Sequence, residues 1–106
     1  MEVLHWSEDG DGELSAETMR RKLEALGCTV SQYTYPPGTF FSTHTHDVDK
    51  IDGVLSGRFE LTMPDGSLVL GPGDMLVIPQ GTEHSARVLG GAAVISLDGV
   101  RIVHDT

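Results

Sequence analysis

The sequence predicts a single all-β domain, an antiparallel sandwich or barrel, with one helix near its N-terminus. From residue 29 onward, short apolar runs such as GVLSGRFELTM and MLVIP alternate with glycine- and proline-containing turns, a pattern typical of antiparallel β-structure. Only the stretch LSAETMRRKLEALG has helical periodicity. With 106 residues, 39% of them apolar, the chain is large enough for one compact core and too small for two.

The helix is predicted over residues 16–26. Ser15 precedes it as a candidate N-cap and Gly27 follows it as a stop signal. Apolar side chains recur at helical spacing at Leu14, Met19, Leu23 and Leu26. The acidic stretch EDGDGE before the helix predicts a turn.

The strands follow one another with short connections. The segment PDG joins residues 59–63 to residues 67–70 as a hairpin, and GPGD supplies the next turn. We therefore expect residues 1–30 to form an N-terminal arm and helix that pack on the barrel. Residues 31–106 form the barrel itself.

Charge limits the partners that the chain can bind. Sixteen acidic and seven basic residues give a formal net charge of −9, which repels phosphate backbones and anionic lipids. The one basic cluster, residues 20–22, lies within the predicted helix and is interpreted as its solvated face. We expect neither a nucleic-acid nor a membrane partner.

Cysteine usage indicates a reducing environment. The lone Cys28 excludes an intramolecular disulfide, and the sequence shows neither a signal peptide nor an apolar run that spans a membrane. The expected localisation is therefore cytoplasmic. Cys28 has no nucleophile motif around it and is interpreted as a small packed side chain.

Three of the five histidines occur where they can form a site. His44 and His46 are one residue apart, so on an extended strand both side chains lie on the same face, about 7 Å apart at the backbone. His84 follows 38 residues later at the start of another strand. His5 is interpreted as a surface residue near one end, and His104 with the final two residues as a loose tail.

The residues around these histidines match two motifs. Counting from Gly38 to Val88, eight of ten fixed positions agree with G-x5-H-x-H-x3-E-x6-G and G-x5-P-x-G-x2-H-x3-N. The chain therefore resembles the cupin superfamily, and within it the small, uncharacterised single-domain cupins. The resemblance implies a small antiparallel jelly-roll (cupin) β-barrel that pairs as a homodimer. It also implies that His44, His46 and His84 point into the barrel as ligands of a divalent metal ion.

Two positions depart from the motifs. Val88 stands where the second motif has asparagine, and Lys50 stands where the first has glutamate. A protonated lysine cannot bind a metal ion, and its charge repels one. A carboxylate close in sequence, Asp52 or Asp49, is a candidate replacement ligand.

Three interpretations of Lys50 remain open. It points outward and pairs with Asp47 or Asp49, or it lies inside the barrel paired with Asp52, or it is catalytic as an acid, a base or a binding group for a substrate carboxylate. Strand alternation in the family register places Lys50, Asp52, Val54 and Ser56 inside. The opposite set of Ile51, Gly53 and Leu55 is more apolar, so the helix or a second subunit should cover it.

Three functions are consistent with these residues. The first is a metal-dependent enzyme, a dioxygenase, isomerase or similar cupin, that acts on a small polar molecule at an open three-histidine site. The second is a non-catalytic cupin that binds a small molecule, and the third is a structural barrel with a degenerate, metal-free site. Imidazole ligands suit iron, nickel, zinc, manganese and copper alike.

Overall fold

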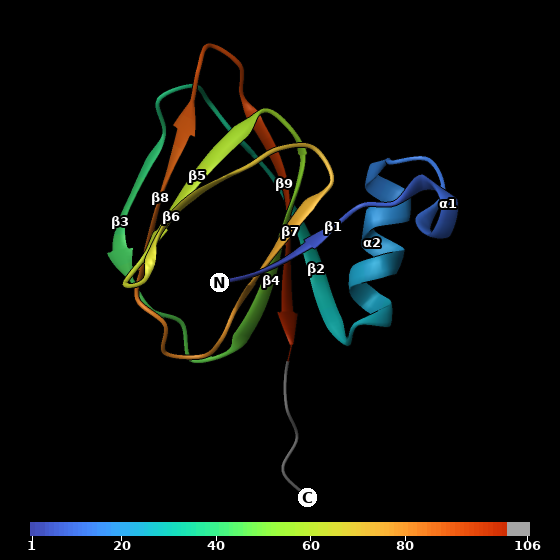
Figure 1. The fold of residues 1–106 in the computed structure, drawn as a ribbon, viewed down its shortest axis with the longest axis horizontal. Coiled ribbons are helices and arrows are strands. Elements are labelled where there is room, and N and C mark those ends of the chain that lie inside the picture. The colour runs from blue at the N-terminus through green and yellow to red at the C-terminus, as the bar shows by residue number, and fades with distance from the viewer. Residues whose placement is uncertain (102–106) are drawn as a thin grey trace, which may run out of the picture.

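Two antiparallel sheets pack face to face in a computed structural model that describes residues 1–101 (Figure 1). In spatial order, the larger sheet contains β1 (Glu2–His5), β7 (Asp74–Ile78), β4 (Asp49–Ser56), β9 (Val94–Arg101) and β2 (Cys28–Tyr35). The smaller contains β3 (Phe40–His44), β8 (His84–Leu89), β5 (Arg58–Met63) and β6 (Gly66–Leu70). This is the predicted all-β jelly-roll barrel.

The helix forms where its sequence signals indicate. α2 (Ala16–Ala25) begins after Ser15, whose hydroxyl accepts a hydrogen bond from the Thr18 amide while the Thr18 hydroxyl accepts one from the Ser15 amide. This reciprocal pairing satisfies two amides at the helix start. The acidic stretch before it differs from the prediction, because Glu8–Asp11 winds into a short helix, α1.

Apolar residues form two layers, one on each side of the larger sheet. The layer between the sheets contains Val54, Phe59, Leu61, Met63, Leu70, Leu76, Ile78, Ala86, Val88 and Val94. The layer between the larger sheet and α2 contains Met19, Leu23, Cys28, Ile51, Met75 and Leu97. The outer face of β4 is therefore covered by the helix, and Cys28 is a packed core residue as expected.

Gly53 allows the helix to approach β4 closely. A Cβ atom at this position would lie 2.6 Å from the sulfur of Met19 on α2 and 3.2 Å from Cγ of Met75. A strand residue with a side chain would push the helix away from the sheet. Glycine on the apolar face of β4 thus lets that strand be buried on both sides.

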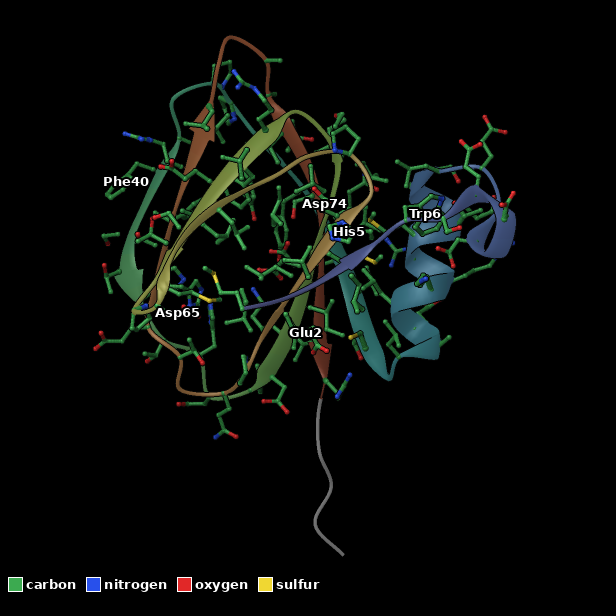
Figure 2. All side chains as sticks on the ribbon, in the orientation of Figure 1. Glu2, His5, Trp6, Phe40, Asp65 and Asp74 are labelled. Carbon is green, nitrogen blue, oxygen red and sulfur yellow. The ribbon has the colours of Figure 1, made fainter. Side chains whose placement is uncertain are left out.

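The N-terminal segment contributes a strand that its sequence did not predict. β1 pairs with β7 from Glu2↔Val77 to His5↔Asp74, and the His5 imidazole lies 2.9 Å from the Asp74 carboxylate (Figure 2). His5 is well exposed, as expected. The predicted loose tail around His104 lies outside the described residues.

Within residues 1–101, no helix has the length and apolar character needed to cross a membrane.

Candidate metal centre

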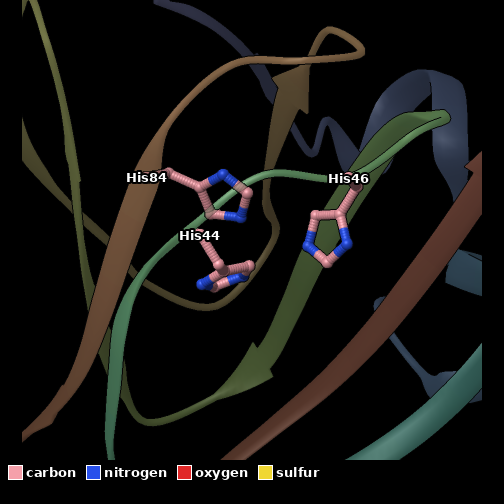
Figure 3. Close-up of side chains that lie close together, drawn as sticks. All are labelled: His44, His46 and His84. Carbon is pink, nitrogen blue, oxygen red and sulfur yellow. The ribbon is translucent and has the colours of Figure 1, made fainter.

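The three histidine side chains come close together (Figure 3). His44 ends β3 and His84 begins β8, and these two residues face each other in the register of the paired strands. His46 follows in the loop between β3 and β4. The Gly81 amide donates a hydrogen bond of 2.9 Å to the His46 carbonyl. That bond ties the His46 loop to the loop leading into His84.

The rings are arranged so that one ion can contact all three. Their centroids are 4.3 to 5.1 Å apart, and one nitrogen from each residue lies within 4.8 Å of the other two. Nδ1 of His44 donates to the Ser42 carbonyl at 2.6 Å, and Nδ1 of His84 donates to the Thr82 carbonyl at 3.0 Å. Because a carbonyl only accepts, these bonds place the ring proton on Nδ1 and leave Nε2 unprotonated.

The protonation state of the histidines also suits a metal ion. Burial lowers the pKa of His46 and of His84, and the positive charge of Lys50 lowers both further. Neutral imidazole is the form that binds metals. The donor set therefore fits a divalent transition-metal ion, with coordination positions left open beside the three rings.

The histidines line a cavity of about 270 Å³ inside the barrel. Four aromatic side chains line it, Tyr33, Tyr35, Phe41 and Phe59, together with Leu61 and Ala86. Three charged side chains complete it: Lys50, Asp52 and Asp98. A small molecule in this space would contact the histidines, an apolar wall and the charged groups together.

Comparison with known families matches the Cupin_2 family, described as the cupin domain, to residues 31–103. This chain is a cupin. The match begins within β2 and includes β3 through β9. No protein of curated function matches the chain.

Solved cupin structures share the fold at low identity. KdgF from Halomonas sp. is 24% identical, with a TM-score of 0.62 over 73% of this chain and 72% of that one. The Cupin_2 domain of an XRE family transcriptional regulator from Enterobacter cloacae is 19% identical, with a TM-score of 0.64 over 76% and 87%. The DMSP lyase DddQ from Ruegeria pomeroyi DSS-3 is 26% identical, with a TM-score of 0.65 over 76% of this chain and 41% of its own length.

Lys50, which replaces the glutamate of the cupin motif, lies inside the barrel. Its Nζ is 3.3 Å from Oδ1 of Asp52 and 3.8 Å from Oδ2 of Asp98, and the three side chains are 12 to 16% exposed. Of the three interpretations of Lys50, the inward one paired with Asp52 describes its position. Val88, which replaces the asparagine, is buried in the apolar layer between the sheets.

The two candidate replacement carboxylates lie in different places. Asp49 begins β4 and accepts a hydrogen bond of 2.7 Å from the Gln80 amide. It is not among the residues that line the cavity. Asp52 lines the cavity and pairs with Lys50. Neither Asp49 nor Asp52 belongs to the group of converging metal-ligand atoms, which consists of the three histidines.

Asp98 was missed by the sequence reasoning. It lies on β9 directly opposite Asp52 on β4. Its carboxylate accepts hydrogen bonds from the Ser96 hydroxyl at 2.6 Å and from the Tyr35 hydroxyl at 3.3 Å. Alternation along VISLD puts Ser96 and Asp98 on the same face as the buried Val94. This alternation is the sequence signal that could have identified Asp98 as a residue facing the inside of the barrel.

Asp52 titrates far from the usual range of a carboxyl. Burial, and after it the nearby Asp98, raise its pKa to about 7, with Lys50 opposing the rise. The side chain of Tyr35, against Asp98 in the same cavity, also has a raised pKa, chiefly because of burial. The polar side of this cupin cavity thus holds a proton near neutral pH.

The raised pKa of Asp52 predicts a pH-dependent stability difference. The folded pKa of about 7 exceeds the value of 3.8 for a free aspartate, so protonation stabilises the fold, and that stability is lost as pH rises from about 4 to 7. We therefore expect Asp52→Asn to gain stability relative to wild type over this range, by at most about 1.4 kcal/mol per pH unit. Urea unfolding of both proteins in chelator from pH 4.5 to 8.5 measures the difference, in which the histidine contributions cancel. If the difference in unfolding free energy between the two proteins does not change with pH, the raised pKa of Asp52 is wrong.

Proposed function

We propose that this cupin binds one divalent metal ion through His44, His46 and His84 and holds a small polar molecule in the adjoining cavity. The observation that carries the proposal is the fixed orientation of His44 and His84. Each ring donates from Nδ1 to a backbone carbonyl two residues earlier in the chain. That arrangement presents the two Nε2 atoms as ligands without further rearrangement.

The chain's own residues define what such a ligand must look like. The three histidines hold the metal, and when bound, the metal supplies a Lewis acid that polarises an oxygen-containing group. Phe41 and Phe59 exclude water on the apolar side of the cavity. The Tyr35 hydroxyl and the carboxylates of Asp52 and Asp98 offer hydrogen-bonding groups in the same cavity. A molecule with polar groups at two ends and a short apolar body fits this lining.

Catalysis is the further part of the proposal. The relative from Ruegeria pomeroyi is named a DMSP lyase, so at least one protein of this fold is an enzyme on a small molecule. A dioxygenase, isomerase or lyase reaction at the open metal positions is consistent with three neutral ligands. Fold alone does not select among these reactions.

A second candidate function is metal-free ligand binding by the same cavity. The observation that favours it is Lys50, a buried ammonium at the position where the cupin motif has a metal-binding glutamate. In this case the histidines, with Lys50, would bind an anionic or hydroxylated molecule directly. Saturable thermal stabilisation by small organic acids and polyols in the presence of a chelator would support this function.

Metal content tests the proposal. We expect untagged protein, purified without chelators or metal-affinity resin, to carry close to one equivalent of a transition metal by elemental mass spectrometry. The reason is that three preorganised imidazoles bind such ions strongly. Absence of metal, together with no uptake after incubation with Zn²⁺, Ni²⁺, Mn²⁺ or Fe²⁺, would refute the metal site and leave the second candidate.

A further inference from the structure

Lys50 poses an electrostatic problem for a metal site in this barrel. In the cupin motif, a glutamate at this position contributes a charge of −1 beside three neutral imidazoles. Here an ammonium lines the same cavity as the histidines. Because Lys50 and the three rings line one cavity, its positive charge acts on any cation that they hold. Alone, Lys50 would weaken the binding of any cation.

The side chains around Lys50 reverse the sign of the local charge. Asp52 and Asp98 flank its Nζ at 3.3 and 3.8 Å. When both carboxylates are ionised, above about pH 7, one ammonium and two carboxylates together carry −1, the same charge as the single glutamate of the motif. Asp98 lines the same cavity as the three histidines, so its charge also acts on the site.

The cluster is built to keep these charges in place. Asp98 accepts hydrogen bonds from the hydroxyls of Ser96 and Tyr35 in addition to facing Lys50, which is the surrounding of a charged carboxylate. Oδ1 of Asp52 is fully buried, and although Lys50 lies 3.3 Å away, the atom has no hydrogen bond of good geometry. An unsatisfied buried carboxylate oxygen is costly. A divalent cation held by the three rings in the same cavity would lower that cost.

We propose that Lys50, Asp52 and Asp98 act as one unit of net charge −1, which takes over the electrostatic role of the missing glutamate without contributing a metal ligand. The inference rests on the proposed metal site. It makes Asp98, from a strand outside both cupin motifs, a positioning residue for the metal ion. The departure from the motif at Lys50 is then compensated by the two aspartates beside it.

Affinity for Zn²⁺ in variants of known charge tests the unit. Wild type carries −1, Asp98→Asn carries zero, and Lys50→Met carries −2. The double variant Lys50→Met with Asp98→Asn returns to −1. Competition with a fluorescent zinc chelator at pH 8, above the pKa of about 7 of Asp52, gives each dissociation constant. Melting temperatures in chelator establish that each variant is folded.

We expect Asp98→Asn to bind Zn²⁺ about tenfold more weakly than wild type, because a full charge is lost in a partly desolvated site. The double variant should return to within about threefold of wild type, since the net charge is restored although both contacts are gone. Glu60→Gln is the matched control, because it removes the same charge from an ion pair with Arg87 outside the cavity. It should leave the affinity unchanged.

The outcomes separate this inference from the proposed function. If wild type binds no Zn²⁺, the metal site itself is refuted. If wild type binds Zn²⁺ but Asp98→Asn binds equally well, or the double variant is no better than Asp98→Asn, the metal site stands and the charge unit is refuted. A purely structural role for Asp98 would lower the melting temperature of Asp98→Asn and would give no recovery of affinity in the double variant.

Discussion

Replacing His84 by alanine should weaken Zn²⁺ binding by about 100-fold or more. The ring supplies one of three converging nitrogens, and its Nδ1 bond to the Thr82 carbonyl already holds it in position. Loss of a supporting outer contact costs metal affinity about 10- to 100-fold, and loss of a ligand itself should cost more. Calorimetric titration with Zn²⁺ measures the change directly.

Thermal stability gives a second measurement of the same prediction. A ligand that binds only the folded state at 100 times its dissociation constant stabilises that state by about 2.7 kcal/mol. Wild type should therefore melt at a higher temperature in excess Zn²⁺ than in chelator, and the shift for His84→Ala should be much smaller. The matched control is His5→Ala, because His5 is an exposed histidine on β1 far along the chain from the site. Equal zinc-dependent shifts in wild type and His84→Ala would rule out His84 as a ligand.

A Lys50→Glu variant should lose about 3–5 kcal/mol of folding free energy at pH 8 in chelator. The substitution restores the cupin motif, yet in this cavity it removes the ammonium between Asp52 and Asp98 and adds a third carboxylate. Breaking a buried ion pair by removing one partner has a cost of this size. The loss should become smaller at pH 5, where the clustered acids take up protons.

Lys50→Met is the control for the added charge. It also removes the ammonium, but it leaves two carboxylates and adds an apolar side chain of similar length. We expect it to be more stable than Lys50→Glu and less stable than wild type in urea unfolding at pH 8. A Lys50→Glu protein as stable as wild type without metal would show that the contacts of Lys50 with the two aspartates contribute nothing to folding.

Local signals made much of the fold predictable. The Ser15 cap and the apolar spacing after it predicted α2. Glycine and proline residues predicted where the strands end, because their backbone preferences favour turns. The fixed spacing of the motif residues also predicted the grouping of the histidines, because it depends on local turns. His44 and His84 each sit at a strand end whose turn is encoded a few residues away.

Features that depend on distant pairing were not predictable in this way. β1 is a four-residue strand with little periodicity of its own, and its partner β7 lies about 70 positions later. Asp98 meets Asp52 only through the register of β9 against β4, which no local pattern specifies. Alternation was enough to place Lys50 on the inner face. Its second partner, Asp98, could be identified only from the register of β9 against β4.

The order of strands in the larger sheet also bears on how the molecule folds. β2 pairs with β9 from Cys28↔Arg101 to Tyr35↔Val94, and β4 docks on the other side of β9. Closing such long loops is entropically unfavourable before the contacts form, so folding in milliseconds to seconds is expected. Lys50 and Asp52 share β4, so it is Asp98 that joins them only when β9 pairs with β4. If that pairing completes after the transition state, the electrostatic cost of the cluster changes the unfolding rate more than the folding rate.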